Sequence, residues 1–237
     1  MTKLGLLADR LVEAGWLVLV AVTPLYFGVF SNRVFEPDKL IAMRCLALVM
    51  GAAFIVGWLE RWRYDAPAVA GGWARLPGSL LRSLRSDPIL AATVALVAVS
   101  ALATITSIVP RTSLWGSYVR LQGLYTLLSF DAVFLMMRQR LRSQAQVDRL
   151  VTVIIITALP VAIYGILQHF GIDLLPWSGD TTFRVTSTMG NAIFLAAYLG
   201  MVVPLAAAKL VGSLRQLATA PDDAEGEGSI MGIARYG

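Results

Sequence analysis

The chain has 237 residues, of which 57% are hydrophobic and only 15% are charged. A soluble domain of this size carries about 25% charged residues, so this chain has too few polar side chains to cover a globule in water. Much of its surface must therefore face lipid. The single cysteine, Cys45, excludes internal disulfides, and the single histidine, His169, argues against a metal centre, so no metal or cofactor is expected.

Six apolar segments predict an all-α fold, a polytopic transmembrane helix bundle of about six spans. Most of them approach the roughly 20 residues that cross a bilayer as a helix, whereas the fourth has only 14. The first follows Lys3 and Arg10, as in a signal peptide, but residues 31–35 offer no small-residue cleavage pattern, so we expect a retained span. The segments are Trp16–Phe30, Leu40–Trp58, Ile89–Val109, Leu124–Met137, Val151–Phe170 and Ala192–Ala208.

The lysines and arginines are distributed unevenly between these segments. Fourteen of the 20 lie in the N-terminal tail, residues 59–87, residues 138–150 and the tail after the last segment, against five in the other loops. This positive-inside pattern predicts that both termini are cytoplasmic. It also accounts for the net charge of +5, so we expect membrane lipids rather than nucleic acid as partners.

The same patterns divide the chain into two parts. Residues 1–210 are predicted to form the transmembrane helical domain, in which residues 59–87 are a cytoplasmic interfacial loop that mixes aromatic, leucine and arginine side chains. Residues 211–237 are predicted to be a cytoplasmic tail of disordered character, because residues 222–228 are acidic and rich in glycine.

Three loops fall on the external face in this topology, and each carries lysine or arginine. External loops tend to lack these residues, so Arg120 and Arg184 need another explanation. A guanidinium group matches the oxygens of phosphate, and pyrophosphate at a membrane surface is the natural ligand. Hydroxyls of Ser187 and Thr188, with backbone N–H groups near Gly190 at a helix start, would add neutral donors. The three loops are residues 31–39, 110–123 and 171–191.

Each of these features also has a purely structural explanation. An arginine at a helix boundary, such as Arg184, commonly reaches to lipid phosphate or pairs with a nearby carboxylate such as Asp180. Serine and threonine before an apolar segment form an ordinary helix start. On spacing alone the structural explanation is the commoner one, and both stay open.

The external loops resemble those of a known family. Arg184 followed by Ser187-Thr188-Met189-Gly190-Asn191 and an apolar helix is similar to the arginine–glycine–asparagine–proline entry into the core region of the O-antigen ligase/polymerase family, with Ala192 in place of the proline. Residues 115–123 and 35–39 look like loops from the N-terminal halves of some members.

This resemblance implies a polytopic protein of the bacterial inner membrane that acts on the external side in lipopolysaccharide or polysaccharide biosynthesis. Family members are glycosyltransferases that move a glycan from a polyprenyl-pyrophosphate carrier to lipid A core, another glycan or a protein. The resemblance implies that Arg184, and more weakly Arg120, bind the carrier's pyrophosphate, with Ser187, Thr188 and Asn191 as further substrate-binding candidates. Catalytic residues are not assigned.

The resemblance covers residues 10–210 and corresponds to the N-terminal half of the family, so we expect a truncated or split form. The alternative is a non-catalytic membrane scaffold, or a subunit that binds lipid-linked glycan within a larger membrane complex. Another membrane subunit is then an expected partner. A small transporter is a third class, but no inverted repeat or paired broken helices are visible.

Three titratable residues lie within or beside the spans. Arg44, five residues past Lys39, either snorkels to the outer interface or lines a polar cavity. Asp131 lies midway along the fourth span, where we expect it to pair with an arginine such as Arg44 or Arg120. The alternatives are a neutral carboxyl group, a position in a water-filled cleft and a general-base role. His169 ends the fifth span and has no fixed partner that would make it a base.

Overall fold

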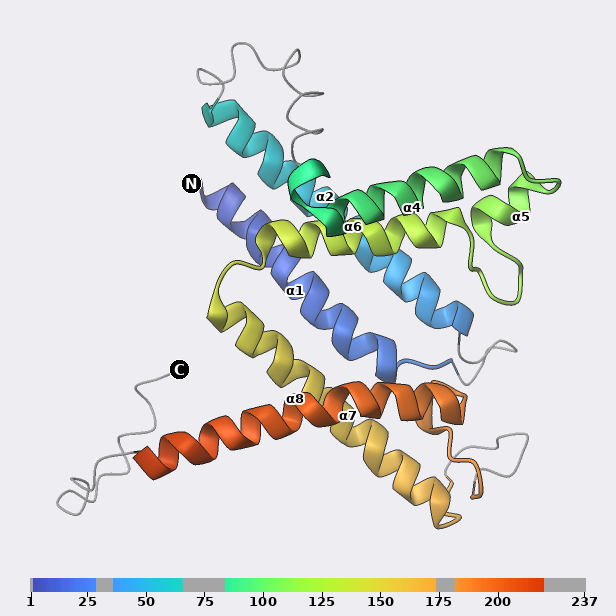
Figure 1. Ribbon diagram of the computed structural model, residues 1–237, viewed down its shortest axis with the longest axis vertical. Coiled ribbons are helices and arrows are strands. Elements are labelled where there is room, and N and C mark those ends of the chain that lie inside the picture. The colour runs from blue at the N-terminus through green and yellow to red at the C-terminus, as the bar shows by residue number, and fades with distance from the viewer. Residues whose placement is uncertain (1, 29–35, 66–83, 174–181, 220–237) are drawn as a thin grey trace.

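The computed structural model describes residues 2–28, 36–65, 84–173 and 182–219, in which all regular elements are helices (Figure 1). The predicted all-α fold is therefore confirmed for this part of the chain. The labelled helices are α1 (Lys3–Leu25), α2 (Glu36–Asp65), α4 (Pro88–Ile105), α5 (Pro110–Trp115), α6 (Leu124–Arg140), α7 (Gln144–His169), the 3-10 helix η2 (Ser187–Met189) and α8 (Ala192–Thr219).

Four of the described helices are long and apolar enough to cross a membrane: residues 36–63 of α2, α4, α7 and residues 192–218 of α8. They correspond to the second, third, fifth and sixth predicted segments, so the chain is a multi-pass membrane protein. Helices α1 and α6 coincide with the remaining two segments but are not among the four. Charged residues occupy the first half of α1, and α6 has only 17 residues, the last turn of which carries Arg138 and Arg140.

Local capping explains why several helices begin earlier than apolar length predicts. The side chain of Thr2 accepts a hydrogen bond from the Gly5 backbone N–H at 3.1 Å, so α1 begins at Lys3 rather than near Trp16. A capping box between Ser143 and Gln146 starts α7 at Gln144. The helix ends also differ: α4 stops at Ile105, and α8 continues past the expected boundary at residue 210 to Thr219. Residues 66–83 of the predicted interfacial loop and residues 220–237 of the predicted tail lie outside the described residues.

The hydrophobic core lies between α1, α2 and α6. It is built on Trp16, which is fully buried, and Met50, which packs against Gly15 so closely that a Cβ there would lie 2.3 Å from the Met50 Cγ. Helix α7 packs on the other side of α1, and α8 packs on α7. The buried core residues are Val12, Trp16, Met43, Ala47, Met50, Val133 and Met136.

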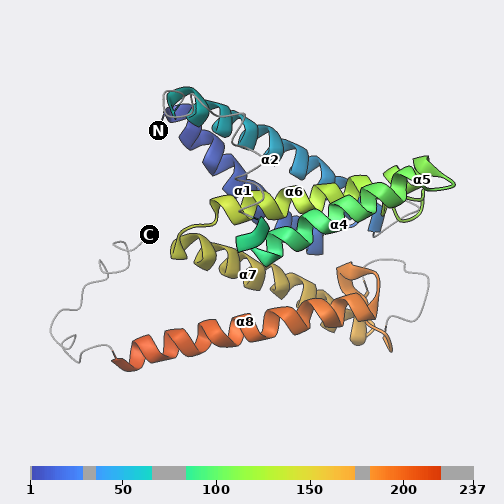
Figure 2. The ribbon, with the colours of Figure 1, turned by 45° about the horizontal axis from the view of Figure 1, so that its top comes forward.

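The long helices alternate in direction, so the bundle has two distinct ends (Figures 1 and 2). The start of α1, the end of α2, the α6–α7 connection and the end of α8 lie together at what we call the turn end. The end of α1, the start of α2, helix α5, the following loop and η2 lie at the opposite end, which we call the loop end. The described parts of the chain segments that the charge pattern assigns to one side of a membrane thus lie at the turn end.

The outer surface of the bundle is apolar, as expected of a protein that contacts lipid. Helix α4 has no buried residue, and its large side chains Val99 and Leu102 are 66% and 62% exposed. Isoleucine and leucine side chains of α7 and α8 are exposed in the same way. Lipid acyl chains would cover such a surface at no cost in hydrophobic free energy.

Candidate functional site at the loop end

Two loops at the loop end each contain a non-glycine residue in the left-handed region of backbone conformation. Leu121 has φ of 53° and Ser187 has φ of 48°. Such conformations cost about 1–3 kcal/mol for a residue with a side chain and persist only where surrounding contacts hold them.

The first loop, residues 116–123, is closed by a pair of glycines. Gly116 has φ of 88°, and a Cβ on it would lie 2.2 Å from the carbonyl carbon of Leu121. A Cβ on Gly123 would lie 2.3 Å from the backbone nitrogen of Gly116. At both positions a Cβ would clash with backbone atoms, which cannot move aside as a flexible side chain can, so only glycine fits. This compact loop carries Arg120, whose side chain is exposed.

Arg44 of α2 holds this loop from inside the bundle. Its guanidinium donates to the carbonyl oxygens of Trp115, at 3.0 Å, and Leu121, and to the hydroxyl of Thr126, and it lies 4.7 Å from the ring centroid of Tyr125. The Arg44 residue is 8% exposed. Arg44 was predicted either to snorkel to the outer interface or to line a polar cavity. It does neither, because it is buried and its hydrogen bonds hold a strained loop.

Gln168 of α7 has the corresponding role for the second loop, residues 182–191. This side chain is fully buried, and its Oε1 accepts the backbone N–H groups of Ser187, at 2.7 Å, and Thr186, at 3.3 Å. Its Nε2 donates to Asp173 at 3.1 Å, and Asp173 also accepts from the hydroxyl of Tyr164. Sequence reasoning missed Gln168, because a glutamine at a helix end gives no signal of a partner 19 residues away.

The hydroxyls of Ser187 and Thr188 point into the bundle. Ser187 Oγ donates to the carbonyl of Val161 at 2.7 Å, and Thr188 Oγ1 donates to the carbonyl of Pro24 at 2.7 Å. Pro24 lies in the last turn of α1, so Thr188 satisfies one of the carbonyls that a helix end leaves without a partner. Lys39 also holds this loop, because its Nζ donates to the Thr188 carbonyl oxygen at 2.8 Å. Both hydroxyl hydrogens are thereby used within the protein.

The remaining predicted site residues lie at the surface or at a helix start. Arg184 is exposed, and no hydrogen bond or ion pair joins its side chain to another described residue. Asn191 is the N-terminal cap of α8, since its Oδ1 accepts the Ile193 backbone N–H at 3.0 Å. Asp180, the carboxylate suggested as a partner for Arg184, lies outside the described residues. The structure thus brings Arg184, Ser187, Thr188 and Asn191 into one loop, and Arg120 into a second loop at the same end.

An apolar groove of about 610 Å³ begins beside this second loop. Lys39, Glu36 and Met189 line it at the loop end, and the exposed Arg184 belongs to the same chain segment as Met189. From Phe194 to Leu205 the groove follows α8 for about 16 Å, at 1.5 Å per helical residue. Its other lining residues are Leu19, Val20, Thr23, Pro24, Ile154, Tyr198, Met201 and Val202.

Five side-chain polar atoms are buried with no hydrogen-bond partner among the described residues, and two of them bear on the predicted site. One is the hydroxyl of Tyr198, which lines the groove, and the other is Asp131 Oδ2 in α6. The predicted pairing of Asp131 with Arg44 or Arg120 is wrong for the described structure, because Asp131 Oδ2 has no partner there and the Nε and Nη2 donors of Arg44 bond the 116–123 loop and Thr126. His169 has a partner in the described structure. Its Nδ1 lies 3.1 Å from the Thr182 carbonyl oxygen, so this side chain joins the end of α7 to the second loop.

Fold and site together define a helical multi-pass membrane protein with two clamped loops and an apolar groove at one end of the bundle. No protein-family model, curated protein or solved structure matches the chain. The likeness of its loops to the O-antigen ligase/polymerase family therefore enters the proposal below as a hypothesis.

Proposed function

We propose that this chain is an O-antigen ligase/polymerase-like protein of the bacterial inner membrane, which takes part in the transfer of a glycan from a polyprenyl-pyrophosphate carrier to an acceptor on the external side. In this proposal α1 and α6 cross the membrane with the other four long helices, both termini are cytoplasmic, and the loop end is external. The observation that carries it is the apolar groove that opens beside the loop of Arg184.

The groove and the loop suit the two chemical halves of such a carrier. A polyprenyl chain is apolar and flexible, and a groove lined by leucine, valine, isoleucine and methionine favours it over water. The pyrophosphate would then lie at the groove's loop end, within reach of cations. Arg184 is exposed and its side chain has no partner among the described residues, and a guanidinium binds phosphate oxygens through two parallel hydrogen bonds.

The proposed chemistry is displacement at the anomeric carbon of the sugar. An acceptor hydroxyl gives up its proton to water and forms the new bond to that carbon, while the bond to the pyrophosphate breaks and the polyprenyl pyrophosphate leaves with the electron pair. Arginines would stabilise the developing negative charge. The hydroxyls of Ser187 and Thr188 support this site by holding the loop, since their donors already have protein partners.

The alternative is a non-catalytic subunit that binds a lipid-linked glycan, or a scaffold that packs against another membrane protein. The feature that favours it is α4, which has no charged residue and no buried residue in the described structure. Such a helix is free to pack against a second subunit as well as against lipid.

Glycan transfer in cells tests the proposal directly. Arg184→Ala should abolish transfer while leaving membrane insertion intact, and Arg184→Lys should not restore it, because an ammonium group lacks the planar fork. Arg111→Ala is the matched control, since Arg111 is an exposed arginine of α5 at the same end. Unchanged glycan profiles in Arg184→Ala would refute the proposal. Purified chain that binds polyprenyl-pyrophosphate glycan without transferring it would support the alternative.

A further inference from the structure

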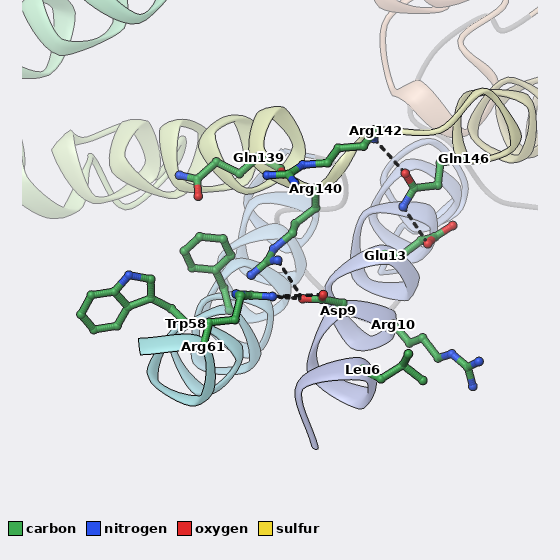
Figure 3. A pocket seen from close by; sticks show the side chains of 11 residues that line it. Leu6, Asp9, Arg10, Glu13, Trp58, Arg61, Gln139, Arg140, Arg142 and Gln146 are labelled. Atoms are coloured by element: carbon green, nitrogen blue, oxygen red, sulfur yellow. Dashed lines mark hydrogen bonds and ion pairs between the residues drawn. The ribbon is translucent and has the colours of Figure 1, made fainter. Parts of the chain in front are cut away.

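A second pocket, of about 550 Å³, lies at the turn end, at the opposite end of the bundle from the groove (Figure 3). Helices α1, α2 and α6 and the first turn of α7 form its walls. Four arginines and two carboxylates line it together with apolar side chains. The lining residues are Leu6, Asp9, Arg10, Glu13, Phe54, Trp58, Arg61, Gln139, Arg140, Arg142 and Gln146.

The centre of the pocket has two guanidinium groups on one carboxylate. Arg61 of α2 lies 3.2 Å from Asp9, and Arg140 of α6 lies 3.1 Å from the same side chain (Figure 3). The Arg140 side chain is only 14% exposed and stacks over the ring of Phe54, with its Cζ 5.1 Å from the centroid. One carboxylate cannot neutralise two arginines, so an excess positive charge remains at a place where Arg140 is shielded from water and Arg61 is partly exposed.

The second carboxylate does not supply the missing charge. Glu13 accepts from Gln146 at 3.0 Å and pairs with Arg149, which is outside the lining. Burial raises the pKa of Glu13, but hydrogen bonds from Gln146 and Arg149 outweigh it and keep that pKa below its ordinary value. Its charge is therefore directed toward α7 rather than toward Arg61 and Arg140.

Two guanidinium N–H groups of the arginines at this pocket have no partner in the part of the chain that the structure describes. Arg61 Nη2 and Arg140 Nε are buried, and neither forms a hydrogen bond with any described residue. A buried donor without an acceptor costs about 1–3 kcal/mol, and more for a charged group. Both atoms have almost no accessible surface, so an anion in the pocket would first contact the exposed parts of the two guanidinium groups, where it would balance the excess charge as phosphate does beside paired arginines.

The apolar side chains that line the pocket indicate which kind of phosphate-containing molecule fits it. Leu6 and Trp58 line the pocket and are 44% and 49% exposed, so apolar surface continues from the pocket to the outside of the bundle. Trp58 stacks on Trp62 with ring planes 5° apart, and tryptophans of this kind lie at the level of lipid headgroups. An amphiphile would place its phosphate among the arginines and its chains along Leu6 and Trp58.

We propose that the turn-end pocket binds the phosphate group of an anionic phospholipid through Arg61 and Arg140, with Arg10 and Arg142 adding positive charge. Basic pockets between membrane helices recognise lipid headgroups by the same electrostatics. Lipid bound here would join α1, α2 and α6 at the end where their charged residues meet. The site is independent of glycan transfer and of the groove at the loop end.

Lipid-dependent melting of the purified full-length chain tests this. Addition of phosphatidylglycerol to protein in neutral detergent should raise the melting temperature saturably, whereas phosphatidylcholine should not. Arg61→Lys/Arg140→Lys keeps both charges and the pairing with Asp9 but removes the unpartnered donors, so the apparent affinity for phosphatidylglycerol should fall about tenfold. Arg63→Lys/Arg85→Lys makes the same change at exposed arginines near the turn end but outside the lining and should bind like the wild type.

Two further measurements keep the test decisive. Arg142→Gln removes a lining charge whose Nε bonds only the Gln139 carbonyl, so it should fold normally and still weaken binding, unlike Arg63→Gln. Glycerol phosphate distinguishes the source of the phosphate: a response to phosphatidylglycerol alone identifies a lipid site, and equal responses to both identify a site for free phosphate esters. The proposal is overturned if neither ligand raises the melting temperature, or if the double lysine variant responds like the wild type.

Discussion

The guanidinium of Arg44 donates to the carbonyl oxygen of Leu121, the residue at which the 116–123 loop adopts φ of 53°. The same side chain reaches Trp115 and Thr126, so one arginine of α2 ties together the end of α5, the loop and the start of α6. An intramembrane arginine is normally read as part of an ion or substrate pathway. Here it holds in place the loop that carries Arg120.

Arg44→Met should therefore loosen the first loop. The substitution keeps the apolar length but leaves the carbonyls of Trp115 and Leu121 without a charged donor, and hydrogen bonds to charged groups are worth about 1.5–3 kcal/mol each. We expect a loss of about 3 kcal/mol in the free energy of unfolding in detergent micelles. Arg44→Lys should lose less stability, because its ammonium group can still donate to some of the oxygens that accept from Arg44. Equal stability of Arg44→Met and wild type would show that the loop is held otherwise.

Gln168→Leu should release the second loop. The backbone N–H groups of Thr186 and Ser187 would lose their acceptor in a fully buried position, at about 1–3 kcal/mol for each unsatisfied group. Hydrogen exchange of these two amides should speed up strongly while the amides in the middle of α7 exchange as before. Gln168→Glu is the useful comparison, because it keeps an oxygen that accepts from Thr186 and Ser187 but loses the Nε2 group that donates to Asp173. Unchanged exchange in Gln168→Leu would contradict the assigned role.

Gly123→Ala should be far more harmful than alanine at a glycine with open surroundings. A Cβ at Gly123 would lie 2.3 Å from backbone nitrogen, whereas nothing lies within 4 Å of a Cβ at Gly212 in α8. We expect Gly123→Ala to cost more than about 3 kcal/mol and Gly212→Ala to stabilise by up to about 1 kcal/mol, as alanine does in a helix. The comparison is made by unfolding in the same detergent. Similar stabilities would mean that the backbone contact between Gly116 and Gly123 is absent.

The start of α4 should respond to acid. The backbone N–H of Leu90 and the guanidinium of Arg138 both bond Asp87 and hold its pKa below the ordinary value. A lowered pKa stabilises the fold above the unfolded-state value of about 3.9, and that contribution disappears as pH falls through the folded-state pKa. Thermal unfolding should thus show an acid-dependent loss below about pH 4, which Asp87→Asn lacks because its amide oxygen still caps the helix without titrating. An identical pH profile in both proteins would refute this.

Accessibility labelling tests the orientation of the bundle. The chain has one cysteine, so Cys45→Ser provides a background for single-cysteine variants. Phe183→Cys is at a 93% exposed position of the loop end, and Ala145→Cys is at an exposed position in the first turn of α7 at the turn end. Membrane-impermeant maleimide applied to intact cells should label the first and not the second. The reverse result would place Arg184 in the cytoplasm and remove the basis of the glycan-transfer proposal.

Apolar length was enough to locate α2, α4, α7 and α8, because crossing a bilayer is a local requirement that some 20 consecutive residues meet on their own. Arg184 and Arg120 were selected as binding candidates from the sequence alone, since positive charge in a predicted external loop contradicts a simple compositional rule, and their role stays a prediction. The roles of Arg44, Gln168, Ser187 and Thr188 were not predictable in this way. Their partners are Leu121, Ser187, Val161 and Pro24, between 19 and 164 residues distant in the chain. Only the packing of α1, α2, α6 and α7 brings those groups within hydrogen-bonding distance, and buried polar atoms then bond whichever acceptors the packing supplies.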